Sequence, residues 1–522
     1  MRNPAAITRR RVLQSGAGAL ALLASTPFGS AWAQSEGATR ILRAPKTALV
    51  LGNARYRNVP ELLHPANDAN AIAALLGQCG FAVTALVDAE RGKMASSIGD
   101  YAEALARDKS VGIFYFAGHG LQLGWHNYLV PVDASIHRPE DIPAQAVDIA
   151  MVLDGMAKAD NPMNVLILDA CRDNPFGSYR VEQKGLSQMD APARTLLAYA
   201  TAPGNVASDG EGQNGLYTEN LLREMKTREA KIEDVFKRVR LAVRRASHGR
   251  QIPWESTSLE EDFYFFPPES LKKLSREEED KAFASELAQF TRAIDANDTA
   301  LLVEYLQLYP SGQFAELAEL PLDRLLAAQG ERPVEPAPAA GNPYTAGWAR
   351  ADTRFRVGDS YTYDTTNRKN GNTRRRTHIV TKVTDLEIVF GDGELVCDPL
   401  GNVLKFPGGL RWGLHQEVPL EYAVGKRWTT RFDVLAGGNG TNTLAYRVAA
   451  REKVTVPAGT FDAFRVEGRG LNESPFRAAN ELRFTTWRAP ELRLWIAFEH
   501  LVTSPGATEI SLRSELVSYR QA

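Results

Sequence analysis

Short apolar runs alternate with amphipathic segments from residue 46 to residue 267. Several of these runs are apolar at every position, which is typical of strands covered on both faces of a parallel sheet. We expect strands at residues 47–51, 82–87, 111–116, 165–168, 196–200 and 263–266. We expect helices between them at residues 67–76, 93–106, 215–225 and 232–246, the last with a one-sided apolar stripe. This pattern predicts an α/β domain with a mostly parallel sheet flanked by helices.

The rest of the chain has a different pattern. Residues 275–328 are charged and helical without strand signals, which predicts a short helical repeat-like module. Residues 329–343 are rich in Pro, Ala and Gly and predict an exposed linker. From residue 346 to residue 522, turn signals separate strand-like runs, so we expect an antiparallel β domain, either a sandwich or a partial barrel. The expected strands include 359–363, 378–383, 444–448, 453–456, 463–467, 482–487 and 494–499.

The first residues predict a targeting segment. Three arginines, Arg9 to Arg11, precede an apolar run from residue 16 to about residue 28, and Ala31-Trp32-Ala33 has the pattern of a cleavage site. This arrangement resembles the bacterial twin-arginine signal, and its apolar run is too short to cross a bilayer. We therefore expect residues 1–33 to be a signal peptide and the mature protein to work in the periplasm or outside the cell. The alternative is an uncleaved membrane anchor.

Composition narrows the functional classes. The chain has 522 residues, enough for two to four domains, and a formal net charge of −2, which gives no sign of a nucleic-acid or anionic-membrane binder. Its three cysteines, Cys79, Cys171 and Cys397, are too few for a disulfide framework, and we take Cys171 as the candidate free thiol. We find no metal-ligand spacing, phosphate-binding loop or dinucleotide fingerprint.

Two residues with catalytic chemistry follow apolar strand patterns. His119, flanked by Gly118 and Gly120, comes after one predicted strand, and Cys171 ends another. The carboxyl ends of parallel strands meet at one edge of a sheet, so we expect the two to lie close together. A nearby imidazole favours the reactive thiolate and later protonates a leaving amine. Taken singly, His119 is better explained as an ordinary turn histidine and Cys171 as a buried inert thiol. The two together, with their strand context and their spacing of 52 residues, favour the catalytic interpretation.

Asp169 indicates which substrates the thiol would attack. Residues two apart on a strand project to the same face, so Asp169 is expected to face the same region as Cys171. A carboxylate there would attract Lys or Arg in the residue just before the cut bond. The alternative is that Asp169 caps the turn or helix that follows.

Several strings in this region resemble the caspase-like cysteine peptidases, in particular the bacterial metacaspase-like or orthocaspase proteins. The matching strings occupy residues 48–53, 65–69, 115–120, 168–176 and 250–255. The resemblance covers about residues 46–267. It implies a caspase–haemoglobinase fold, a catalytic dyad of His119 and Cys171, and cleavage after Arg or Lys. It also implies that backbone N–H groups of Gly120 and Cys171 bind the oxyanion.

The resemblance carries three further implications. Asp68 and Asp169 match acidic positions that hold the substrate's basic side chain, although Asp68 is equally placed to cap a helix. No cofactor is expected. Some relatives need calcium, but Asp173 alone does not make the aspartate cluster that holds it in them, which argues against a calcium requirement here. Many relatives process themselves after a basic residue. The candidate self-cleavage sites after the cysteine are Arg180, Lys184 and Arg194.

The sequence therefore predicts an exported cysteine endopeptidase that cuts peptides or proteins after Arg or Lys. We expect no nucleic-acid partner and no stable membrane span after signal cleavage, and the helical or β domain offers a surface for a protein partner. Two alternatives stay open. One is a catalytically silent caspase-fold binding or scaffold protein of the periplasm, and the other is a cysteine hydrolase acting on a non-peptide amide.

Overall fold

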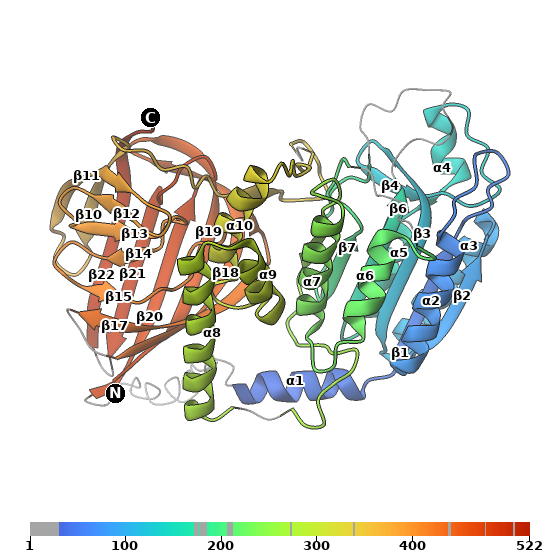
Figure 1. Cartoon of the computed structure of the whole chain (residues 1–522), viewed down its shortest axis with the longest axis horizontal. Helices are drawn as coiled ribbons and strands as arrows, with labels where there is room; N and C mark the ends of the chain where they lie inside the picture. Colours follow the sequence, from blue (N-terminus) through green and yellow to red (C-terminus); the bar gives the residue numbers. More distant parts are fainter. Residues whose placement is uncertain are drawn as a thin grey trace, which may run out of the picture.

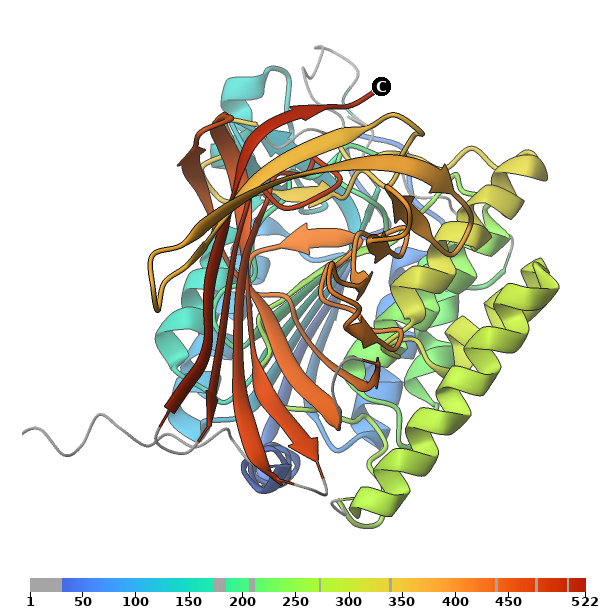
Figure 2. The same cartoon turned by 90° about the vertical axis from the view of Figure 1, so that its left-hand side faces the viewer.

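The computed structural model describes residues 31–171, 176, 185–205, 212–271, 274–337, 340–436, 440–474, 477–504 and 507–522. It confirms the predicted class: an α/β domain is followed by helices and then by an antiparallel β domain (Figure 1). In Figure 1 the helices α8 to α10 lie against the β domain, on its side toward α7. Figure 2 looks from the side of the β domain, so its orange and red strands lie in front of the α/β domain.

The α/β domain is built on one sheet with strand order β2-β1-β3-β6-β7-β8. Its strands are parallel except β8, which pairs antiparallel with β7 at one edge. A short hairpin-like extension, β4 with β5, continues from the far end of β3. The strands are β1 (Lys46–Gly52), β2 (Ala82–Val87), β3 (Val111–Leu123), β4 (His126–Leu129), β5 (Val147–Asp148), β6 (Asn164–Cys171), β7 (Thr195–Tyr199) and β8 (Trp254–Thr257).

Helices cover both faces of this sheet. One face packs against α2 (Pro65–Gln78), α6 (Leu216–Met225) and α7 (Ile232–Ala246), and the other packs against α3 (Arg91–Asp108) and α5 (Ala150–Ala159). Helix α7 has the predicted bounds, and its whole apolar stripe is buried against the sheet. This double cover explains why the runs at residues 111–116 and 165–168, within β3 and β6, are apolar at every position.

The predicted strand at residues 263–266 is wrong. Phe263 and Phe265 are buried in the core, but the only pairing there is an isolated bridge between Lys231 and Tyr264. The edge strand is β8 instead, whose sequence is largely polar. A short apolar run indicates that a segment is buried. It does not show that the segment is a strand, because a buried loop can have the same run of apolar residues. Helix α5 and the strands β4 and β5 were not predicted.

Helix α1 (Ala31–Arg43) begins at the predicted cleavage site and places Ile41 in the core of the α/β domain. Residues 1–30 of the predicted signal peptide lie outside the described residues, so the signal stays a prediction. Across the part of the chain that the structure describes, no helix is both long enough and apolar enough to span a membrane.

The helical module consists of α8 (Arg276–Ala296), α9 (Thr299–Leu308) and α10 (Ala315–Ala328). Its apolar side chains share one core with the β domain, and Leu241 of α7 packs against the same cluster. Residues 329–337, which follow α10, are largely exposed, and the segment that continues from them makes contacts with the α/β domain. The side chain of Asn342 is buried and donates a hydrogen bond to the Gln188 carbonyl at 2.7 Å.

The β domain is a closed antiparallel barrel rather than a sandwich or a partial barrel. A separate pair, β9 (Trp348–Arg350) with β16 (Glu421–Ala423), lies outside it. Predicted strands 444–448 and 453–456 belong to one long strand, β18, which forms a hairpin with β19. The barrel strands are β10 (Ser360–Asn367), β11 (Thr373–Val383), β12 (Ile388–Phe390), β13 (Leu395–Cys397), β14 (Val403–Lys405), β15 (Arg411–Trp412), β17 (Arg427–Ala436), β18 (Thr441–Val456), β19 (Gly459–Ser474), β20 (Arg477–Arg488), β21 (Ala497–Ser504) and β22 (Ala507–Arg520).

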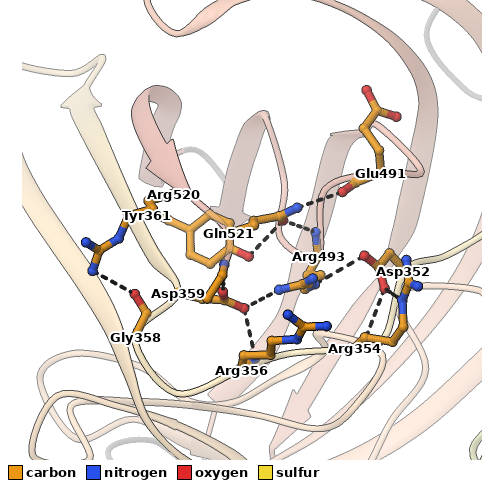
Figure 3. Close-up of polar contacts among 11 residues, drawn as sticks. Asp352, Arg354, Arg356, Gly358, Asp359, Tyr361, Glu491, Arg493, Arg520 and Gln521 are labelled. Carbon is orange, nitrogen blue, oxygen red and sulfur yellow. Dashed lines mark hydrogen bonds and ion pairs between the residues drawn. The ribbon is translucent and has the colours of Figure 1, made fainter.

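A buried ionic cluster fastens one end of the barrel (Figure 3). Arg493 pairs with Asp352 and with the fully buried Asp359, and Asp359 also accepts the N–H of Ala522 at 2.7 Å. Gln521 accepts from the Tyr361 hydroxyl at 3.0 Å. These contacts hold the last residues of the chain beside β10, where the barrel closes through its pairing with β22.

Candidate active site

His119 and Cys171 occupy neighbouring positions of the sheet. Strands β3 and β6 are parallel, and their register pairs His119 directly with Cys171. Adjacent strands lie about 4.8 Å apart, so the two backbone positions are immediate neighbours. His119 is 7% exposed. The side chain of Cys171 and residues 172–175 lie outside what the structure describes.

The loop after β1 fixes the backbone of His119. The Tyr56 hydroxyl accepts the His119 N–H at 2.8 Å, and the two rings lie 4.7 Å apart. On the other side, the Val130 N–H donates to the His119 carbonyl at 3.0 Å. Gly118 has φ +150°, and a Cβ there would lie 2.6 Å from the Tyr56 hydroxyl oxygen. Both peptide groups of His119 are therefore held, and Gly118 leaves room for Tyr56 to reach them.

Asp68 and Asp169 converge from elements far apart in the sequence. Asp68 lies in the first turn of α2, and Asp169 lies on β6 two residues before Cys171. Both carboxylates border Gly215, which precedes α6. An added Cβ at Gly215 would lie 3.2 Å from Asp68 Oδ2 and 3.9 Å from Asp169 Oδ2. The structure thus brings the two predicted acidic residues to one place.

The contacts of Asp68 exclude the capping alternative for its own helix. Its Oδ1 accepts from the Asn214 side chain at 2.8 Å and from the Gly215 N–H at 3.1 Å. Both donors belong to the segment before α6, and no side chain caps α2. Burial raises the pKa of the Asp68 carboxyl to about 6, while the hydrogen bonds from Asn214 and Gly215 act in the opposite direction.

A hydroxyl chain supports Asp169. The Thr218 hydroxyl donates to Asp169 Oδ2 at 2.6 Å, and the Tyr115 and Thr218 hydroxyl oxygens also lie 2.6 Å apart. Because the one Thr218 proton goes to Asp169, Tyr115 is the donor in the second bond. Burial, followed by the charges of Asp169 and Asp68, raises the pKa of Tyr115 well above its usual value, so the phenol keeps this proton.

Of the other predicted site residues, Gly120 lies beside the dyad and Arg194 lies far from it. Gly120 pairs with Leu129 of β4 and lies so close to Ala170 that a Cβ on it would be 3.1 Å from the Ala170 side chain. Arg180 and Lys184 lie outside the described residues. Arg194 immediately precedes β7 at the amino end of the sheet, where it pairs with Asp160. From the eight-residue length of β6, Arg194 is on the order of 20 Å from Cys171.

The other two cysteines sit away from this edge. Cys397 is buried in the barrel, where burial raises its thiol pKa far above the usual value, and burial likewise raises the pKa of Cys79 to about 11. Neither is poised as a thiolate at neutral pH. Among the described residues, no group of three or more His, Cys, Asp or Glu side chains has the arrangement of a metal site.

Sequence reasoning missed the residues that support this site. Tyr56, Asn214, Gly215 and Thr218 act through contacts between segments that are distant along the chain. One signal was available for Gly215, since it is the first residue of the helix predicted at residues 215–225.

Comparison with known proteins agrees with this geometry. Residues 45–264 match the family model described as the caspase domain. A segment of 165 residues, 31% of this chain, is 32% identical to the human mucosa-associated lymphoid tissue lymphoma translocation protein 1 and 31% identical to its mouse homolog. The match covers 19% of each of those proteins, so the chain spans about a fifth of their length. The α/β part of this chain is therefore a caspase-like domain.

Proposed function

We propose that the protein is a cysteine endopeptidase that cuts after Arg or Lys, with His119 and Cys171 as its catalytic dyad. The observation that carries this proposal is the register of β3 and β6, which pairs His119 with Cys171. The match of residues 45–264 to the caspase domain supports the reaction class. The convergence of Asp68 and Asp169 beside the end of β6 supports the preference for basic side chains.

The reaction then follows from the chemistry of the two residues. The Cys171 thiolate attacks the carbonyl carbon of the cut bond, and the N–H groups of Gly120 and Cys171 stabilise the oxyanion. As the C–N bond breaks, His119 protonates the leaving amine, which leaves an acyl group on the sulfur as a thioester. His119 next takes a proton from water, which attacks the thioester and releases the carboxylic acid product and the thiol.

The acidic pair gives the reaction its substrate preference. A desolvated carboxylate binds a guanidinium or ammonium group strongly, because the charge-assisted hydrogen bonds replace water on both partners. Two carboxylates also disfavour an aspartate side chain at the same position. We therefore expect Arg or Lys, and not Asp, in the residue before the cut bond.

Reporter peptides that differ only in the residue before the cut bond test this proposal. The full mature chain should release the reporter from Arg or Lys peptides and not from the Asp peptide, and Cys171→Ala should lose the activity. Preference for Asp would refute the role of Asp68 and Asp169. No cleavage of any peptide under reducing conditions, with and without calcium, would instead favour a catalytically silent binding or scaffold protein.

We extend the proposal to location and processing. The twin-arginine pattern of residues 9–11 and the apolar run that follows support export to the periplasm or beyond. Self-cleavage after Arg180 or Lys184 is part of the proposal, because both follow Cys171 closely in the chain. Arg194 is a weaker candidate, since it lies at the opposite end of β6. Sequencing the amino ends of fragments from wild type and Cys171→Ala tests each position.

A further inference from the structure

Gly215 lies at the amino end of α6 in a conformation that does not need glycine. Its backbone angles, φ −60° and ψ 150°, are ordinary extended values that any L-residue adopts. Residues with a capping side chain, such as Ser or Asp, are favoured at this position of a helix, and Gly215 supplies none. The backbone therefore does not explain the absence of a side chain, and the explanation lies in the surrounding space.

Two carboxylates and one ring-bearing side chain surround that space. A Cβ on Gly215 would meet Asp68 Oδ2 at 3.2 Å, Asp169 Oδ2 at 3.9 Å and the Cβ of His64 at 4.0 Å. The first distance is shorter than an ordinary van der Waals contact, so a methyl group would press directly on the Asp68 carboxylate. Because Gly215 has no side chain, the space beside it between the Asp68 and Asp169 carboxylates stays open; we call this space the gap.

The two oxygens of Asp68 are in different situations. Oδ1 accepts two hydrogen bonds, from the Asn214 side chain and the Gly215 N–H. Oδ2 receives no hydrogen bond from any residue that the structure describes, although Asp68 as a whole is only 3% exposed. A carboxylate oxygen that receives no hydrogen bond from the described residues keeps its lone pairs for a cationic donor from outside the protein. This oxygen faces the gap above Gly215.

We propose that Gly215 is a specificity-determining residue: the gap that it leaves between Asp68 and Asp169 receives the cationic end of the substrate's basic side chain. This inference rests on the proposed peptidase function and adds the residue that sets the size of the binding space. Asn214 and Thr218 are positioning residues, since each holds one carboxylate by a hydrogen bond. A guanidinium is broad and planar while an ammonium is compact, so the gap discriminates between them by size.

The substitution Gly215→Ala tests this role with matched Arg and Lys reporter peptides. The methyl group should raise KM for the Arg peptide about tenfold or more and affect the Lys peptide less, so that the Arg-to-Lys ratio of kcat/KM falls about tenfold. The rate at which iodoacetamide alkylates Cys171 should not change, because the dyad is not touched.

Gly212→Ala is the matched control. Gly212 lies three positions earlier, and a Cβ there would make only an ordinary contact of 3.5 Å with Glu219. It should leave both KM values and the Arg-to-Lys ratio unchanged. An unchanged ratio in Gly215→Ala would overturn the inference. A wild type that cleaves neither basic peptide would instead refute the proposed function, so the two failures are distinguishable.

A second measurement uses only the wild-type protein and does not depend on how the variant folds. Peptides with arginine or with asymmetrically dimethylated arginine before the cut bond carry the same charge but differ in the bulk of the end group. The wild type should cleave the dimethylated peptide at least about tenfold less efficiently, because the gap fits one unsubstituted guanidinium. Equal cleavage of the two peptides would overturn the inference.

Discussion

At the scale of single residues, the main result is that Asp68 and Asp169 meet. The Asp68 side chain is buried, and this burial raises the pKa of its carboxyl group to about 6. An acid with a raised pKa is protonated below that value and charged above it. A basic substrate group needs the charged form, so the two acids link substrate binding to pH near neutrality.

This linkage predicts the pH dependence of binding. An amidine ligand that mimics the arginine end group should bind Cys171→Ala tightly above about pH 6, where Asp68 is ionised. Below that pH the affinity should fall by up to about tenfold per pH unit, because binding must first displace the proton. Calorimetric titration from pH 5 to pH 8 measures this. In a Cys171→Ala protein that also carries Asp68→Asn, the step near pH 6 should vanish, and its persistence would assign the titration to another group.

At the scale of elements, β3 and the loop after β1 act together. Tyr56 receives the N–H of His119, and Gly118 makes room for it. The Tyr56 hydroxyl thus accepts a hydrogen bond from the backbone N–H of His119, the proposed general base. His119 is the last residue of β3 that pairs with β6. Tyr56 is a positioning residue, since it acts on the proposed chemistry through its hydrogen bond and ring contact with His119.

Tyr56→Phe is predicted to disturb the dyad without removing the ring. The lost acceptor leaves a buried N–H unpaired, a cost of about 1–3 kcal/mol that His119 can relieve by shifting. We expect kcat to fall about tenfold with KM nearly unchanged. The pH at which iodoacetamide alkylation of Cys171 becomes half-maximal should rise toward about 8.5, the value of a free thiol.

Tyr128→Phe is the control for this prediction. Tyr128 is equally buried, and among the residues that the structure describes its hydroxyl makes no hydrogen bond. Its alkylation profile should match the wild type. A wild-type profile in Tyr56→Phe as well would show that the hydroxyl has no influence on the dyad.

The sequence predicts the local parts of this fold better than the contacts between them. The apolar stripe of α7 and the central strands follow directly from periodicity, because burial repeats with the geometry of the element. The strand predicted at residues 263–266 is wrong because Phe263 and Phe265 are buried in a loop, and their alternation has the period of a strand. His119, Cys171, Asp68 and Asp169 were found from residue type and strand position. Tyr56 and Gly215 were missed, since their role arises only when segments far apart in sequence come together.

At the scale of the whole molecule, the α/β domain and the C-terminal part are joined by ion pairs along α7. Arg240 pairs with Glu421 of the β9–β16 pair, and Arg244 pairs with both Asp323 of α10 and Glu331. The side chain of Glu331 is only 6% exposed. Glu331 lies in the segment after α10, which also bonds to the α/β domain through the Val334 N–H and the Gly249 carbonyl. Such contacts between largely desolvated charges are costly to break from one side.

Arg244→Ala should therefore destabilise the junction. Removing the guanidinium takes the ion pair away from the nearly buried Glu331, while Asp323 keeps its pair with Arg350, and we expect a loss of about 2 kcal/mol in the free energy of unfolding. Urea unfolding measures it. Arg245→Ala is the control, because Arg245 is exposed and should change the stability by less than about 0.5 kcal/mol. Equal effects of both substitutions would show that the pairs contribute nothing specific.

The most direct test of the central claim is covalent trapping of the nucleophile. A peptide chloromethyl ketone ending in Arg should alkylate the wild-type protein at Cys171, as read by mass spectrometry of the digested protein. The same reagent ending in Asp should react at least about tenfold more slowly, and His119→Ala should abolish the fast reaction. Labelling at another residue, or equal rates for the Arg and Asp reagents, would contradict the account of a His119–Cys171 dyad served by an acidic pair.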